Sequence, residues 1–298
     1  MRIRLRQLEV FAAVCRHGGI AAAAAHLPLS QSAASQALAE LEAALDAPLF
    51  ERAGRRLVLN ERGRELLPRA LALLEQAQAL ESQARTGALA GTVRLAASLT
   101  IGSYLLPPLL ARLQARHPQL CVELAVVNTQ GVIDAAARFA ADGGFIEGPA
   151  RHPELDIRPW RDDALAVIAA PGHPLARKRR LRPADLGACA WALREPGSGT
   201  REVFERAAQS AGFVPQAVLE LGQSEAVRRA VAASELLGCL SYLALAEART
   251  RGEIAILRTP FLDLRRKLYV VLHRRKFVSA SLAAVLAVCK VPVTAPPR

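Results

Sequence analysis

The chain has 298 residues, of which 52% are hydrophobic and 22% are charged, a composition that excludes global disorder. This length suits two or three folded units. The net charge of +12, with a pI of about 10.5, favours a polyanionic partner, which is either nucleic acid or an anionic membrane surface. The alternative is that the positive charge reflects only a general use of arginine on the protein surface.

Five cysteines are scattered along the chain without a C-x-x-C pair. Their odd number and wide spacing argue against a disulfide framework or a zinc site, and for a reducing compartment. The N-terminus shows no apolar signal segment, and no apolar run reaches membrane-spanning length. We therefore expect a cytoplasmic chain without membrane association, bound metal or cofactor.

Three helices are expected in the first 45 residues. Apolar residues at helical spacing predict the first over Leu5 to His17 and a second over Ile20 to Leu27. The third begins after Ser30, a good N-cap, and runs to about Leu45. Two short helices joined by a tight turn indicate a helix-turn-helix, and two short apolar pieces within residues 49–60 predict a β-wing.

The start of the third helix carries small hydroxyl and amide side chains. Such groups suit base edges in the major groove, where Gln pairs with adenine and Ser contacts bases or phosphates. The candidate base-reading residues are Ser30, Gln31, Ser32, Ser35 and Gln36. Arg52, Arg55 and Arg56 of the wing are expected to clamp the phosphate backbone. A merely polar helix surface and a solvated loop are the alternative interpretations of these two groups.

A longer helix is predicted from Glu61 to about Arg85, with Pro68 disturbing its first turns. Its apolar residues step alternately by four and three, as in the heptad seam of a coiled coil. The seam residues are Leu66, Ala70, Leu73, Ala77, Leu80 and Ala84. Because a lone helix cannot bury such a seam, we predict that it pairs two chains. The alternative is a stripe that packs on its own domain.

Beyond residue 88, strand-like and helical runs alternate, which is typical of an α/β fold. Three Ser/Thr-rich turns, at residues 98–103, 197–201 and 223–225, each lead into a predicted helix. Such turns present free backbone N–H groups and hydroxyls where the helix dipole favours an anion. If the turns converge in a cleft, they would hold a small carboxylate, sulfate or phosphate-like group. Ordinary N-capping is the alternative.

The sequence resembles LysR-type regulators over ordered segments at residues 5–11, 29–38, 41–42 and 48–52. Within that family it most resembles the subgroup containing the sulfur-assimilation regulator of bacilli, although effectors differ among close relatives. The resemblance implies an α/β chain with an all-α N-terminal part and a sensor folded like two-lobed periplasmic binding proteins. The implied division is a winged helix-turn-helix at 1–60, a linker and dimerisation helix at 61–87, and an effector-binding domain at 88–298, with lobe I at about 88–163 and 268–298 and lobe II at about 164–267.

The implied function is sequence-specific transcription regulation controlled by a small, anionic metabolite bound between the lobes. The implied partners are double-stranded DNA with an imperfect inverted repeat, the effector, and a second copy or three further copies of the chain; RNA polymerase is a further candidate. The expected effector residues are Ser98, Thr100, Thr129, Glu147, Ser198, Thr200 and Ser224. Because Glu147 would repel an anion unless Arg201 or a donor on the ligand compensates, an amino- or hydroxyl-bearing acid fits best.

An enzyme is the main rival class. The chain contains no H-E-x-x-H, G-x-S-x-G, Walker or G-x-G-x-x-G motif, so we expect no catalytic residue. The second rival is a constitutive DNA-binding protein with a vestigial sensor. The basic run at residues 177–180 is interpreted as a solvated turn rather than a second nucleic-acid site.

Overall fold

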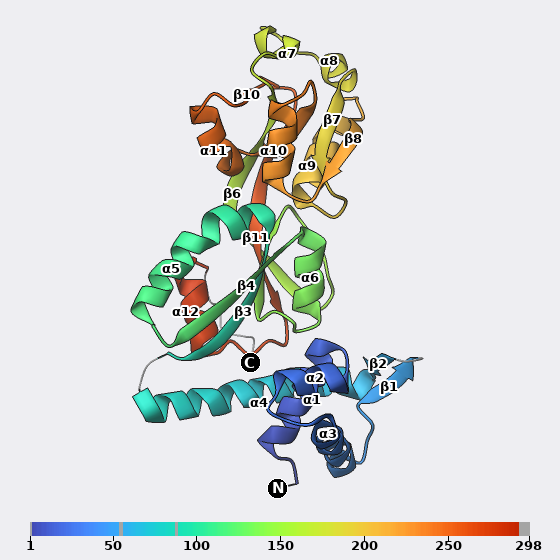
Figure 1. Ribbon diagram of the computed structural model, residues 1–298, viewed down its shortest axis with the longest axis vertical. Helices are drawn as coiled ribbons and strands as arrows, with labels where there is room; N and C mark the ends of the chain where they lie inside the picture. Colours follow the sequence, from blue (N-terminus) through green and yellow to red (C-terminus); the bar gives the residue numbers. More distant parts are fainter. Residues whose placement is uncertain (1, 54–55, 87–88, 292–298) are drawn as a thin grey trace.

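A computed structural model describes residues 2–53, 56–86 and 89–291, which form three tiers along one long axis (Figure 1). The N-terminal helices and a small hairpin form the first tier, and a long helix extends from them beneath the second. The second and third tiers are two α/β lobes joined by two long strands. The predicted fold class is therefore confirmed.

The N-terminal tier is a winged helix-turn-helix. Its elements are α1 (Leu5–His17), α2 (Ile20–His26), α3 (Gln31–Leu45) and the antiparallel hairpin of β1 (Phe50–Ala53) and β2 (Arg56–Leu59). The apolar faces of the three helices meet in one core, whose fully buried residues include Val10, Phe11, Ala23, Ala34, Leu41 and Leu49.

Local signals explain where these helices begin and end. Gly18 adopts a φ of 76°, a left-handed conformation that suits glycine, and so ends α1. Ser30 caps α3 because its Oγ accepts a hydrogen bond from the Ala33 backbone N at 3.2 Å. The predicted bounds of both helices therefore match the structure.

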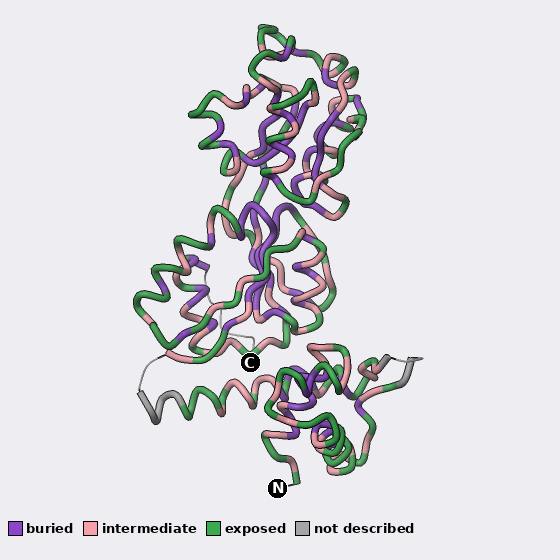
Figure 2. Tube along the Cα trace, viewed as in Figure 1, coloured by how far each residue is buried: buried purple, intermediate pink, exposed green. Residues whose placement is uncertain are grey.

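The long helix α4 (Glu61–Thr86) continues through Pro68 and has two different halves. In the first half, Leu66 and Ala70 contact the core of the N-terminal tier, because α4 packs against α1. In the second half, Leu73 is 52% and Leu80 is 70% exposed. Figure 2 shows only exposed and intermediate colours along the described second half of α4. The predicted seam is thus divided: its first residues pack on their own domain, and its later leucines face outward. The side chain of Ala84 lies outside the described residues.

The lobe nearer α4, which we call lobe I, is built on three parallel strands. Its elements are β3 (Gly91–Ser98), the π-helical turn η1 (Ile101–Leu105), α5 (Leu106–Arg116), β4 (Leu120–Val127), α6 (Thr129–Ala137), β5 (Gly143–Glu147) and α12 (Ala280–Val288). Alternate residues of β3 face opposite sides: Leu95 lies in the cluster under α5 and α12, and Ala96 lies in the cluster under α6.

The far lobe, lobe II, repeats this layering around Trp191, which is fully buried. Its elements are α7 (Pro174–Arg177), α8 (Pro183–Gly187), β7 (Ala190–Arg194), α9 (Gly199–Ser210), β8 (Gln216–Leu221), α10 (Ser224–Ala232), β9 (Leu237–Ser241), α11 (Tyr242–Thr250) and β10 (Ala255–Ile256). Helix α9 covers one face of this sheet, and α10 and α11 cover the other.

Two long antiparallel strands, β6 (Leu155–Ala169) and β11 (Arg265–His273), join the lobes. In lobe I, β11 pairs with β5, and in lobe II, β6 pairs with β9. The strand order is β4-β3-β5-β11-β6-β9-β7-β8, with β10 added beside β6. The strands of both lobes therefore belong to one continuous hydrogen-bonded sheet, which passes from lobe I to lobe II through β11 and β6.

In the described part of the chain, no single helix has both the length and the apolar character needed to cross a membrane. Helices α1 and α2 meet that criterion only when taken together, across a bend of 114°.

Gly63 offers a direct test of how α4 packs on the wing. A Cβ atom at this position would lie 2.3 Å from the backbone O of Leu49, so Gly63→Ala must displace backbone. We expect this overpacking to lower the free energy of unfolding of the N-terminal tier by about 1–3 kcal/mol in urea titrations. Gly172→Ala, where a Cβ meets nothing within 4 Å, is the matched control; equal stability of the two variants would contradict this packing.

Candidate functional site

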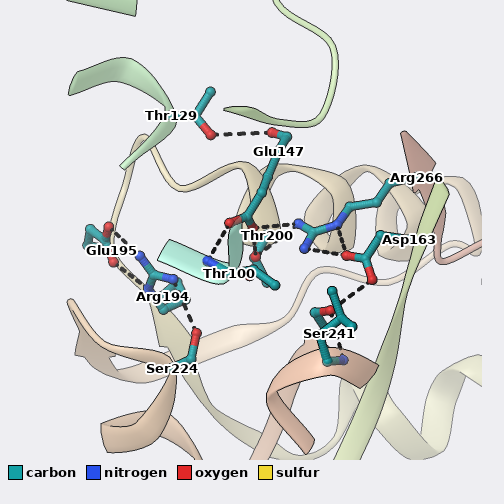
Figure 3. Close-up of polar contacts among 11 residues, drawn as sticks. Thr100, Thr129, Glu147, Asp163, Arg194, Glu195, Thr200, Ser224, Ser241 and Arg266 are labelled. Carbon is teal, nitrogen blue, oxygen red and sulfur yellow. Dashed lines mark hydrogen bonds and ion pairs between the residues drawn. The ribbon is translucent and has the colours of Figure 1, made fainter. Parts of the chain in front are cut away.

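A buried carboxylate lies where the two lobes meet. Glu147, the last residue of β5, is only 2% exposed. Its carboxylate accepts hydrogen bonds from the Thr100 backbone N at 2.7 Å and from Thr200 Oγ1 at 2.7 Å. Arg266 Nη1 lies 2.8 Å from the same carboxylate (Figure 3). Donors from three separate elements therefore converge on one anion.

Each donor comes from a different part of the fold. Thr100 stands in the turn between β3 and η1 of lobe I, Thr200 in the first turn of α9 of lobe II, and Arg266 on the crossing strand β11. The lobes also touch through backbone: a Cβ on Gly199 would lie 1.8 Å from the backbone O of Glu147. Only glycine permits this close approach of α9 to the end of β5.

Arg266 joins Glu147 to a second buried acid. Its Nε and Nη2 lie 2.7 Å and 2.6 Å from Asp163 Oδ2, and Ser241 Oγ donates to Asp163 Oδ1 at 2.8 Å (Figure 3). The side chains of Arg266 and Asp163 are 1% and 3% exposed. We call Glu147, Arg266 and Asp163 the interlobe charge cluster. It carries two negative charges and one positive charge out of contact with water.

The surroundings of Glu147 favour its charged form. Burial raises the pKa of this carboxyl, but the Arg266 guanidinium and the hydrogen bonds from Thr200 and Thr100 outweigh that effect. The pKa of Glu147 is therefore lowered, and the residue is an anion at neutral pH. The Ser98 hydroxyl adds a small lowering of the same pKa, although its geometry falls outside that of a hydrogen bond.

Three further hydroxyls surround the cluster. Thr129 Oγ1 donates to the Glu147 backbone O at 3.3 Å. Ser98 is 2% exposed, and its Oγ has no hydrogen-bond partner among the described residues. Ser198, the N-cap residue of α9, is equally buried and makes no side-chain cap bond. These hydroxyls are therefore buried with the charge cluster where the two lobes meet.

Ser224 belongs to a neighbouring group rather than to the cluster itself. Its Oγ accepts from Arg194 Nη1 at 3.4 Å, and the same guanidinium donates to both carboxylate oxygens of Glu195 at 2.8 Å (Figure 3). Arg201 was the expected compensator of Glu147, but it instead binds Glu205 and Glu220, each at 2.7 Å. Arg266 takes that role, because β11 carries it directly to the lobe junction.

The structure thus brings together Ser98, Thr100, Thr129, Glu147, Ser198 and Thr200, and it places Ser224 beside them. Sequence reasoning did not identify Arg266, Asp163 or Arg194. Each of these three is a charged residue close to an apolar run of its strand. Because such charges are buried only when they are paired, this pattern could have indicated buried ion pairs. Within the described residues, no group of three or more His, Cys, Asp or Glu side chains is placed to hold a metal ion.

A second polar surface lies on α3. The side chains of Gln31, Ser32 and Ser35 face solvent at the N-terminal end of this helix. Ser30 is also exposed, but its hydroxyl is engaged as the cap of α3, and Gln36 Nε2 donates to Glu40 Oε1 at 3.0 Å. In the wing, Arg55 and the side chains of Arg52 and Arg56 lie outside the described residues.

Comparison with known proteins gives matches over nearly the whole chain. The model of the bacterial regulatory helix-turn-helix protein, lysR family, matches residues 5–64, and that of the LysR substrate binding domain matches residues 86–291. The HTH-type transcriptional regulator YeiE of Escherichia coli K12 is 44% identical over 289 residues, which are 97% of this chain and 98% of the relative. CysL of Bacillus subtilis is 35% identical over 264 residues, 88% of each chain.

Among solved structures, a full-length OxyR variant from Pseudomonas aeruginosa has a similar fold. The TM-score is 0.73 at 21% identity, and the match covers 97% of this chain and 95% of that one. At this identity the likeness concerns the fold alone, and it extends over the N-terminal tier, α4 and both lobes.

Glu147→Gln tests the charge of the cluster. Breaking a buried ion pair costs about 3–5 kcal/mol, and we expect about 3 kcal/mol at pH 7 because Arg266 keeps Asp163. Since the folded pKa of Glu147 is lowered, its stabilisation is full above the ordinary value of 4.5 and is lost as the pH falls through the folded value. In chemical unfolding, the difference from the wild type should therefore shrink below pH 4.5.

The control for this substitution is Glu235→Gln, which changes an exposed carboxylate between α10 and β9 of lobe II. It should alter the free energy of unfolding by less than about 0.5 kcal/mol. A stability difference for Glu147→Gln that stayed constant with pH would show that the side chain is not held as an anion.

Proposed function

Because this chain belongs to the LysR family of bacterial transcription regulators, we propose that α3 reads base edges of double-stranded DNA and that the lobe junction binds the controlling effector. In this proposal residues 1–60 bind DNA, residues 61–87 pair the chains, and residues 88–298 sense the effector. The chain acts in the cytoplasm as a regulator and not as an enzyme.

The polar face at the start of α3 supports the DNA-reading role. Gln31, Ser32 and Ser35 are exposed together on the helix that follows the turn of the helix-turn-helix. A recognition helix enters the major groove with its N-terminal residues against base edges. We assign base contacts to Gln31, Ser32, Ser35 and Gln36, and we assign phosphate contacts to Ser30 and to the wing arginines 52, 55 and 56.

The convergence of donors on Glu147 is the observation that carries the sensor proposal. An N–H group of lobe I, a hydroxyl of lobe II and a guanidinium of β11 meet at one point, and they form an anion site built from both lobes. Ser98 adds a buried hydroxyl without a partner among the described residues. A ligand bound at this point would contact both lobes at once and so favour one relative arrangement of them.

The charge already present at the junction defines the class of effector. Glu147 occupies the donors that would otherwise hold the acid group of a ligand, so an anion without a donor of its own would meet a like charge. We propose that the effector is a small acid that also carries an amino or hydroxyl group. Its acid group takes over N–H and hydroxyl donors that Glu147 now holds, and its own donor faces the Glu147 carboxylate.

The exposed half of α4 supports pairing of chains. Leu73 and Leu80 lie on one side of the helix and are largely exposed, and Ala77 lies between them. We propose that this half of the seam makes a homodimer, itself able to pair into a tetramer, and that Leu66 and Ala70 support it from within the domain. Two copies of α3 would then read an imperfect inverted repeat. RNA polymerase is a proposed further partner.

Substitutions in α3 and the wing separate base reading from phosphate binding. Gln31→Ala should weaken binding to the chain's own promoter DNA by about 1–3 kcal/mol and leave binding to random DNA unchanged. Arg52→Ala or Arg55→Ala should weaken both, because phosphate contacts carry no sequence information. Electrophoretic shifts at fixed salt measure both, with Gln209→Ala, an exposed glutamine on α9, as the control. Equal losses on both DNAs for Gln31→Ala would exclude base reading.

Matched pairs of acids test the effector class. Lactate and alanine each differ from propionate by one donor group, and we expect both to bind the full-length chain more tightly than propionate in calorimetric titrations. Thr100→Val should weaken that binding about three- to tenfold, because it removes a hydroxyl that we assign to the ligand. Thr250→Val, on the exposed surface of α11, serves as the control. Equal binding of the matched acids, or binding of none, would contradict the proposed class.

A further inference from the structure

Lys276 lies in the short connection between β11 and α12, and its side chain is only 3% exposed. Its ammonium group contacts two acids from different parts of the chain. One is Glu75, in the middle of α4, and the other is Asp142 of lobe I, whose Oδ1 lies 2.9 Å from Lys276 Nζ. A single buried lysine thus links the helix that extends from the DNA-binding domain to the sensor.

The two acids are held differently. Asp142 is fixed to β3, since the Arg94 backbone N donates to its Oδ2 at 2.7 Å and its own N donates to the Arg94 backbone O at 2.7 Å. Glu75 has no such support: its Oε2 is buried without a hydrogen-bond partner among the described residues. Burial raises the pKa of Glu75, and the contact with Lys276 does not fully offset that rise. Lys276 is therefore the main compensation that Glu75 receives for its loss of water.

The apolar part of this contact is small. Phe139, which follows α6, packs against the hydrophobic core of the N-terminal tier and lies against the ring of His273, with 4.1 Å between ring centroids. Its φ of 55° is unusual for a bulky residue and costs about 1–3 kcal/mol. A cavity of about 750 Å³ lies between α1 and α4 on one side and lobe I on the other, and it is lined in part by Arg16 and Glu75. The two bodies are therefore not closely packed here.

We propose that Lys276 is a latch that holds α4, and with it the DNA-binding domain, against lobe I. Without its charge, Glu75 and Asp142 would face each other as two partly buried carboxylates, and separation of the domains would expose both more fully to water. The latch lies three residues beyond the end of β11, the strand that carries Arg266. The interlobe charge cluster and the latch are thus joined by one extended strand. The latch requires no particular effector and no DNA sequence.

Lys276→Met and Glu75→Gln test the latch in the full-length chain. Hydrogen exchange followed by mass spectrometry should show exchange about tenfold faster, or more, in segments 139–143 and 273–279, which the contact covers. Small-angle X-ray scattering should show a larger maximum dimension for both variants. The double variant should do no more than Lys276→Met alone, since both substitutions remove the same contact.

Lys178→Met is the matched control, because Lys178 also pairs with an acid, Asp185 at 2.8 Å, but on the exposed far end of lobe II. It should leave both measurements unchanged. Wild-type exchange and dimensions in a folded Lys276→Met chain would overturn the latch, as would additive effects of the two substitutions. If Lys276→Met does not fold, hydrogen exchange and the maximum dimension are read from Glu75→Gln, and wild-type values there would overturn the latch. Failure of DNA or effector binding would instead concern the proposed function and leave these readouts intact.

Discussion

One guanidinium shared between two buried carboxylates sets the relation of the two lobes. Arg266 contacts Glu147 at the end of β5 and Asp163 on β6, and hydroxyl and N–H groups of both lobes complete the coordination. Desolvating three charges is costly, and the cost is met only if each charge keeps its partners. The cluster therefore adds little net stability, but it specifies how the lobes face each other.

This constraint explains how a small ligand could control the chain. Glu147 already occupies the N–H, hydroxyl and guanidinium donors at the junction. In the proposed function, an entering acid therefore exchanges partners with the protein's own carboxylate. A ligand shifts a conformational equilibrium only by the difference of its affinities for the two states. The donors come from lobe I, lobe II and β11. In the proposed function, an exchange of their partner from Glu147 to the ligand therefore changes contacts in both lobes and on the strand that joins them.

The sequence predicted features that depend on neighbouring residues. The bounds of α1 and α3 followed from apolar spacing, Gly18 and Ser30, and the hydroxyl-rich turns indicated most of the candidate site. The sequence did not predict the pairing of Asp163 with Arg266. The two are 103 residues apart, and no local sequence pattern indicates that β6 and β11 lie side by side. The heptad spacing of α4 likewise identified apolar positions but not their partners: Ala70 packs on its own domain, whereas Leu80 faces outward.

The central claim is that Glu147 is held as a buried anion between the lobes, and its own titration tests this most directly. In the ¹³C-labelled full-length chain, the Glu147 side-chain carboxyl resonance can be assigned by comparison with Glu147→Gln. We predict that the pKa of Glu147 lies below the ordinary value of 4.5. A pKa above 4.5 would show that burial outweighs Arg266, and the charge-based account of the lobe junction would then be wrong.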